Sequence, residues 1–130
     1  MSMADEKQLW AEDLPDGCPP NDALSVDGQS FFRLVESIPP LERDFWSQRK
    51  LYPLKRFNTS ECIARACSLT TTLDACNRLK KLPVHSHKRV IQIRFTTDCG
   101  VGKRTGREPS HFSWWCRNGF NPIPCCNELL

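Results

Sequence analysis

The sequence has no apolar run that approaches the roughly 18 residues needed to cross a bilayer as a helix. Its first residues, Met1–Lys7, are acidic and lack the basic and apolar regions of a secretory signal. These two absences predict a soluble protein of the cytoplasm that has no membrane partner. At 130 residues, of which 39% are hydrophobic, the chain has the size of one compact domain.

The eight cysteines include no Cys-x-x-Cys pair, the spacing by which one loop presents two thiolates to a tetrahedral zinc ion. Cys125 and Cys126 are adjacent, which suits neither a shared zinc corner nor a disulfide between them. Because an export signal is also absent, we expect eight reduced thiols that serve as small core residues. The His-x-His of His85 and His87 lacks further ligands nearby and is interpreted as a solvated turn. No metal site is predicted.

Charge is distributed unevenly along the chain, although the net charge is only +3. Residues 1–44 hold ten Asp or Glu against three Lys or Arg, whereas residues 45–130 hold five against fifteen. A basic face of this kind attracts an acidic protein partner or the phosphates of a nucleic acid or dinucleotide. The alternative is that the acidic segment folds across the basic face. The basic residues form three clusters: Arg49, Lys50, Lys55 and Arg56; Arg78, Lys80 and Lys81; and Lys103, Arg104 and Arg107.

The first 29 residues contain many turn formers, such as Pro15-Asp16-Gly17 and Pro19-Pro20, and show no apolar period. We therefore interpret residues 1–29 as an acidic, proline-containing leader and residues 30–130 as an α+β domain.

The pattern of residues 30–130 predicts a small, mostly antiparallel sheet with two or three short helices. Apolar and polar residues alternate in the expected strands with the period of two that is typical of a half-buried strand. The best-defined helix has a narrow apolar stripe, an N-cap at Thr71 or Thr72 and cations in its last turn. Gly100 and Gly102 are interpreted as breaks that lead into a basic loop. The expected strands are Phe31–Val35, Cys67–Thr71 and Arg89–Phe95, and the helix is Leu73–Lys81.

A hydroxyl-rich strand end that leads into a helix is a candidate ligand site, because the helix offers free N–H groups to a phosphate. His111, beside Ser113 and two tryptophans, is a candidate for the wall of that site, and the alternative is a structural histidine under an aromatic cluster. Adjacent residues of a strand point to opposite faces. One of Trp114 and Trp115 is therefore expected in the core, which leaves the other to stack on a base or a nicotinamide.

The order of several motifs resembles a family of small uncharacterised bacterial proteins over roughly residues 14–124. In its members the last motif is closer to His-His-Thr-Trp-Trp and the central one to Gly-Leu-Ser. This chain has His111-Phe112-Ser113 and Ala66-Cys67-Ser68 in those places. The resemblance implies a family and no activity. It is carried by Phe32-Arg33-Leu34-Val35, Pro39-Pro40, Asp44-Phe45 with Ser47, Ser68, and His111 to Trp115.

A second set of residues is similar to the core of ADP-ribosyltransferases: Arg33 on a first strand, followed by Ser68 to Asp74 at a strand-to-helix turn. In those enzymes the first-strand cation holds the ribose and phosphate of the dinucleotide, and the hydroxyl groups brace the site. A glutamate on a later strand anchors the nicotinamide ribose as charge develops on it. Glu108 and Glu128, the candidates here, lie in a basic loop and in the tail.

Three classes of function follow from these observations. The first is an NAD-binding or NAD-consuming effector, in which Arg33, Ser68, Thr70 and His111 are catalytic and converge with one tryptophan on a single pocket. The second is a nucleic-acid-binding module. The third is a non-catalytic interaction protein that binds a protein partner through its basic face. The residues assigned to ligand binding are Trp114, Trp115, Lys103, Arg104 and Arg107.

Overall fold

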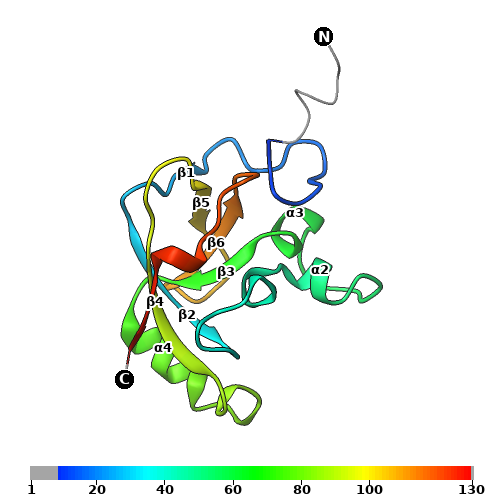
Figure 1. The fold of residues 1–130 in the computed structure, drawn as a ribbon. Helices are drawn as coiled ribbons and strands as arrows, with labels where there is room; N and C mark the ends of the chain where they lie inside the picture. Colours follow the sequence, from blue (N-terminus) through cyan, green and yellow to red (C-terminus); the bar gives the residue numbers. More distant parts are fainter. Residues whose placement is uncertain (1–8, 130) are drawn as a thin grey trace.

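The centre of the fold is a seven-stranded sheet in which every neighbouring pair of strands is antiparallel (Figure 1). The structure is a computed structural model and describes residues 9–129. The strand order is β1-β5-β6-β3-β2-β4-β7, and these elements confirm the predicted single α+β domain. The strands are β1 (Leu24–Ser25), β2 (Ser30–Val35), β3 (Cys67–Thr70), β4 (Arg89–Arg94), β5 (Gly100–Arg104), β6 (His111–Cys116) and β7 (Cys126–Leu129).

The helices are short and begin at residues whose side chains cap them. Thr72 Oγ1 accepts the N–H of Ala75 at the start of α4 (Leu73–Lys80), and Asp74 stabilises the same end through the helix dipole. Ser60 Oγ accepts the N–H of Ile63 in α3 (Glu61–Ala64). The other helical segments are α2 (Gln48–Leu51) and three single turns, η1 (Glu42–Phe45), η2 (Pro83–His85) and η3 (Ile123–Cys125).

The two faces of the sheet are covered differently. One face, here called the core face, carries the largest apolar cluster, which includes Phe31, Leu69, Ile91 and Trp114. The opposite face carries Thr70 and His111, which are paired across β3 and β6. Helix α4 packs on β2 and β3 on this second face, here called the α4 face, and buries Ala75 and Cys76.

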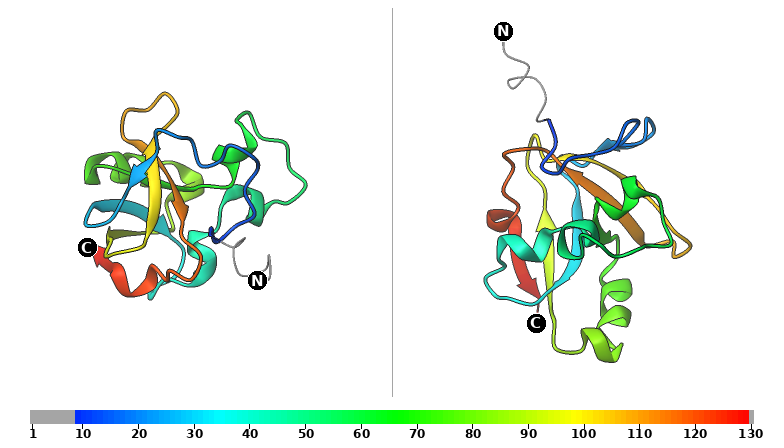
Figure 2. Two further views of the ribbon diagram at one scale, coloured as in Figure 1. Left: turned by 90° about the horizontal axis from the view of Figure 1, so that it is seen from above. Right: turned by 90° about the vertical axis from the view of Figure 1, so that its right-hand side faces the viewer.

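The acidic segment that precedes β2 is part of the domain from residue 9 onward, so the predicted boundary at residue 29 is wrong for the described residues. Strand β1 pairs with β5, and Val26 is completely buried. Figures 1 and 2 show this segment, in blue, running from the side of α3 to the edge of the sheet. A disulfide joins Cys18 to Cys62 with the Cα atoms 5.5 Å apart, and the other six cysteines are free. The expectation of eight free thiols is therefore wrong.

Gly100–Arg104, which was predicted to begin a basic loop, forms strand β5 instead. Gly102 lies opposite Trp114 in β6, where the glycine leaves room for the neighbouring ring of Phe112. No helix in the described part of the chain has the length and apolar character needed to cross a membrane.

Candidate functional site

Arg33 is held by the backbone of two neighbouring elements. Its Nε donates to the carbonyl oxygen of Asp44 at 2.8 Å, and its Nη1 donates to the carbonyl oxygen of Ser68. The ladder between β2 and β3 consists of the single pair Phe32–Thr70, so the guanidinium satisfies a carbonyl group beyond the last pair. Arg33 is thus adjacent to the hydroxyl-rich strand, and two of its N–H groups are already used to hold the backbone.

Ser68 and His111 meet on the α4 face in a chain of hydrogen bonds. Ser68 Oγ lies 3.2 Å from His111 Nε2, and His111 Nδ1 lies 3.1 Å from the carbonyl oxygen of Thr105. His111 Nδ1 also lies 3.0 Å from Thr105 Oγ1, so both ring nitrogens have hydrogen-bond partners within the protein. Thr105 Oγ1 continues the chain to the buried Ser113 Oγ at 2.7 Å.

A base beside a hydroxyl group is the arrangement that activates a nucleophile. Ser68, however, lines neither of the two cavities described below. The hydrogen bonds therefore act mainly to fix the orientation of the His111 ring.

The predicted convergence of the four catalytic candidates on one pocket is wrong. Phe32 pairs with Thr70 and Thr70 pairs with His111, so these three residues share the α4 face. Arg33 is one position away from Phe32 and lies on the core face, because the side chains of a strand alternate. Thr70 is buried, and its Oγ1 donates to the carbonyl oxygen of Phe32 at 3.2 Å.

Both tryptophans of β6 are buried, each with an exposed fraction of 1%. They do point to opposite faces, as predicted, but the α4 face at Trp115 is also covered. Trp114 Nε1 donates to the carbonyl oxygen of Cys99 at 3.0 Å, and Trp115 Nε1 donates to that of Cys62 at 2.9 Å. Neither ring has a broad exposed face on the surface, and both contribute instead to the lining of a pocket described below.

Two of the three predicted basic ligand residues have partners within the chain. Lys103 Nζ lies 2.7 Å from Asp22 in the acidic segment, and Arg104 Nη1 donates to the carbonyl oxygen of Glu108 at 3.4 Å. The acidic segment therefore covers part of the basic surface, which was the alternative left open for the charge pattern. Arg107 lines a cavity on the α4 face.

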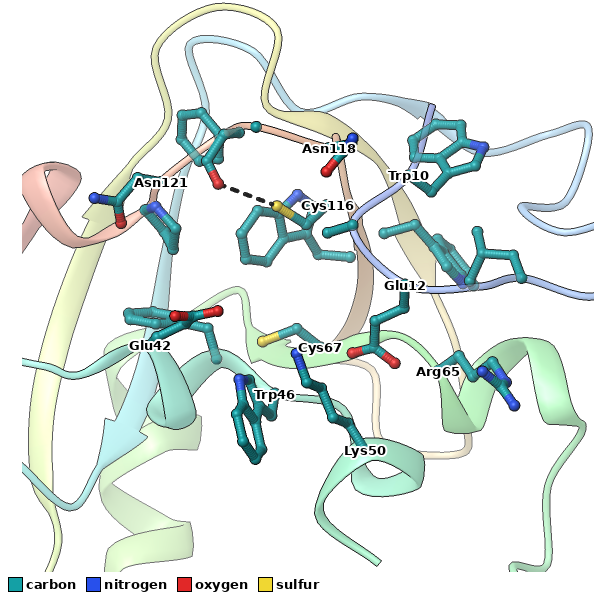
Figure 3. A pocket seen from close by; sticks show the side chains of 18 of the residues that line it. Trp10, Glu12, Glu42, Trp46, Lys50, Arg65, Cys67, Cys116, Asn118 and Asn121 are labelled. Atoms are coloured by element: carbon teal, nitrogen blue, oxygen red, sulfur yellow. Dashed lines mark hydrogen bonds between the residues drawn. The ribbon is translucent and has the colours of Figure 1, made fainter. Parts of the chain in front are cut away.

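A pocket of 410 Å³, here called the aromatic pocket, opens on the core side of the domain (Figure 3). Four segments that are distant in sequence form it, one of which contributes Arg65 and Cys67. Trp10 and Glu12 come from the acidic segment, and Phe45, Trp46 and Lys50 come from η1 and α2. The remaining wall is formed by residues from Trp114 to Ile123.

Lys50 and one unpaired donor distinguish the aromatic pocket, whose other cation, Arg65, is paired with Glu61. Lys50 points into it between Cys67 and Glu12, and its Nζ lies 4.5 Å from the ring centroid of Trp46 (Figure 3). Trp46 Nε1 is buried and has no hydrogen-bond partner among the described residues. A buried N–H without an acceptor is costly, so the pocket suits a ligand that supplies one. Glu12 is already occupied, since its carboxylate accepts from Ser47 Oγ at 2.6 Å and from the Ser47 N–H.

The thiols in the pocket wall are protonated. Burial raises the pKa of Cys67, and burial also raises the pKa of Cys116 to about 12. A thiolate is the reactive form of cysteine, so neither side chain is an activated nucleophile at neutral pH.

Sequence reasoning missed most of the residues that form the aromatic pocket, although Trp114 and Trp115, which were predicted to bind a ligand, belong to its lining. The available signal is the density of aromatic and basic residues in Phe45-Trp46 and Arg49-Lys50, although this pattern by itself predicts only a helix and a charge cluster. Trp10 gave no signal, because it lies in the segment interpreted as a leader.

Comparison of the chain with models of protein families, with curated proteins and with solved structures gave no match. Both resemblances described above therefore rest on the quoted residues alone.

Proposed function

We propose that the protein is a small nucleotide-binding protein whose aromatic pocket holds an NAD-type ligand. The observation that carries the proposal is the buried, unpartnered Nε1 of Trp46 in a pocket with aromatic walls and a lysine. Planar bases pack on aromatic side chains, and a carboxamide or ring nitrogen would accept the indole proton. Lys50, which has no ion pair among residues 9–129, would meet a ribose phosphate.

Size and position also support this ligand. Ligand sites in proteins typically have volumes of about 300–1,000 Å³, so a pocket of 410 Å³ suits one base with its ribose. Arg33 holds Asp44 next to Phe45 of the pocket wall, and β2 lies beside β3. The pocket therefore adjoins the strand that carries Arg33, whose side chain itself holds backbone carbonyl groups.

The proposed role is binding, because the four residues expected to form one catalytic centre are divided between two faces of the sheet. A nucleic-acid module is less well supported, since the tryptophans of β6 are buried and Lys103 is paired with Asp22. A non-catalytic protein of this kind would bind the nucleotide without altering it.

Calorimetric titration with NAD, AMP and nicotinamide mononucleotide tests the proposal. Lys50→Gln should weaken NAD binding about tenfold, the size expected for loss of a charge-assisted hydrogen bond. Trp46→Phe, which keeps an aromatic ring and removes the N–H, should weaken it by a similar factor. Lys55→Gln is the matched control, because Lys55 lies over Tyr52 and Phe57 and does not line the pocket.

Two results would contradict the proposal: no binding of any of the three nucleotides at millimolar concentration, or an equal loss in the Lys50 and Lys55 variants. Release of nicotinamide during the titration with NAD would extend the proposal from binding to consumption of NAD.

A further inference from the structure

A second cavity, of 460 Å³, lies on the α4 face and is here called the α4 hollow. Residues of α4 and the turn after it form one side, and the loop between β5 and β6 forms the other. Thr70 and His111 belong to its lining. The α4 hollow shares no lining residue with the aromatic pocket, so the inference that follows does not depend on the proposed nucleotide site.

Two basic clusters that are separate in sequence meet across this hollow. Arg78 comes from the cluster at the end of α4, and Arg107 comes from the cluster in the β5–β6 loop. Arg107 has no ion pair or hydrogen bond to another described residue. Arg78 pairs with Glu108 at 3.7 Å, and both side chains are more than half exposed, at 60% and 56%. An exposed pair of this kind is worth little, so an anion can replace Glu108 at low cost.

The rest of the lining is apolar or already hydrogen-bonded. Leu79 and Leu82 line the hollow and keep 40% and 48% of their surface exposed. Ala75, which also lines the hollow, is buried. Both ring nitrogens of His111 have partners within the protein. The arginines are therefore the donors available to a ligand, and the leucines offer it apolar surface.

We infer that the α4 hollow binds a small molecule that carries an anionic group on a short apolar chain. The two arginines bind the anionic group, and Leu79 and Leu82 contact the chain. A free inorganic anion would leave the leucines exposed, and an uncharged apolar molecule would leave the cations without a counterion. The shared chemistry fits a phosphate monoester or a carboxylate.

Calorimetric titration of the full chain with hexyl phosphate and, separately, with octanoate tests this inference and identifies the anionic group. Inorganic phosphate tests the anionic group alone, and hexanol tests the apolar chain alone. Each should bind at least tenfold more weakly than hexyl phosphate. Arg107→Gln should weaken binding tenfold or more, because it removes a charge-assisted hydrogen bond. Leu79→Ala should weaken it about threefold to fivefold, because it removes apolar contact.

Arg56→Gln is the charge-matched control, since Arg56 is exposed and lies outside the hollow, and it should leave the affinity unchanged. Circular dichroism of each variant shows whether the fold is retained. The inference is overturned if neither amphiphile binds, or if inorganic phosphate binds as tightly as hexyl phosphate. It is also overturned if short single-stranded RNA displaces hexyl phosphate and loses affinity equally in the Arg107 and Arg56 variants, because that result would indicate a diffuse nucleic-acid surface.

Discussion

The guanidinium of Arg33 lies between two backbone carbonyl groups, with its Nε 2.8 Å from the carbonyl oxygen of Asp44 and its Nη1 donating to that of Ser68. One side chain thus ties β2 to β3 and to η1. The same side chain that resembled a catalytic cation has a structural function at this position. It holds the two strands together where their backbone ladder ends.

Replacement of Arg33 by alanine should lower the free energy of unfolding by about 2–4 kcal/mol, because two carbonyl groups lose a charged donor. Arg33→Lys should retain part of that stability. Urea denaturation measures the difference. Arg94→Ala is a suitable control, since Arg94 is an exposed arginine on the neighbouring strand β4 and should change the stability by less than about 0.5 kcal/mol. A fully stable Arg33→Ala variant would contradict the structural role.

The disulfide between Cys18 and Cys62 should stabilise the domain by holding the acidic segment to α3. The two residues are 44 positions apart, and closing a loop of that length in the unfolded chain is worth about 4 kcal/mol in the chain-entropy model. Cys18→Ser, Cys62→Ser and chemical reduction should therefore have similar effects on stability. Cys99→Ser tests a buried free thiol for comparison.

Titration of the denatured, unreduced protein should find six thiols and not eight. The disulfide belongs to an oxidising environment, whereas the predicted cytoplasmic location implies reduced cysteines. Trapping the thiols with an alkylating reagent at the moment of lysis would decide which state the protein has in its cell. Alkylation of all eight cysteines at lysis would show that the disulfide between Cys18 and Cys62 is not formed in the cell.

Elements with a clear local pattern were predictable from the sequence. Strand β4 alternates apolar and polar residues, and α4 has a capping threonine, so both were found within one residue at each end. Strands β1, β5, β6 and β7 were not among the expected strands, because their segments carry no such alternation. Their strand conformation depends on partners in the sheet, as in the pairing of Leu24 with Gly102.

The candidate sites were less predictable than the fold, for two physical reasons. Strand alternation decides which face a residue occupies, and it separated Arg33 from His111 although their strands lie on either side of β3. The aromatic pocket combines Trp10, Trp46 and the chain after β6, and no spacing in the sequence connects these segments. The two basic clusters at the α4 hollow were identified in the sequence. That Arg78 and Arg107 lie on opposite sides of one cavity follows only from the three-dimensional structure.

The Asp27 carboxylate should make the stability of the domain depend on acidic pH. It accepts the N–H of Cys99 and that of Asp98, each at 3.1 Å, and these bonds, the one from Cys99 first, lower the pKa of Asp27 below 3.8. The lowered pKa means that the folded state favours the charged form. The contribution of Asp27 to the free energy of unfolding is fully present above the unfolded-state pKa. It is lost as the pH falls through the lower folded-state pKa.

Asp27→Asn should therefore lower the urea midpoint at pH 7 and at pH 5, and the difference from the native chain should be smaller at pH 2. Asp16→Asn is the control, because Asp16 is an exposed aspartate in the same segment. An equal difference at all three pH values would show that the charge of Asp27 is not the cause.

Gly102 should tolerate a methyl group poorly because of contact alone, since its φ is not in the left-handed region. A Cβ atom there would lie 2.3 Å from the ring of Phe112 and 2.7 Å from the carbonyl oxygen of Ser113, so β5 and β6 would have to separate. Gly102→Ala should lose at least about 2 kcal/mol of stability, as overpacked sites do. At Gly28, whose φ is +77°, a Cβ atom would meet nothing within 4 Å, so Gly28→Ala should cost only the backbone strain of about 1–2 kcal/mol. Thermal unfolding of the two variants compares these costs, and a smaller loss at Gly102 than at Gly28 would contradict the close approach of the two strands.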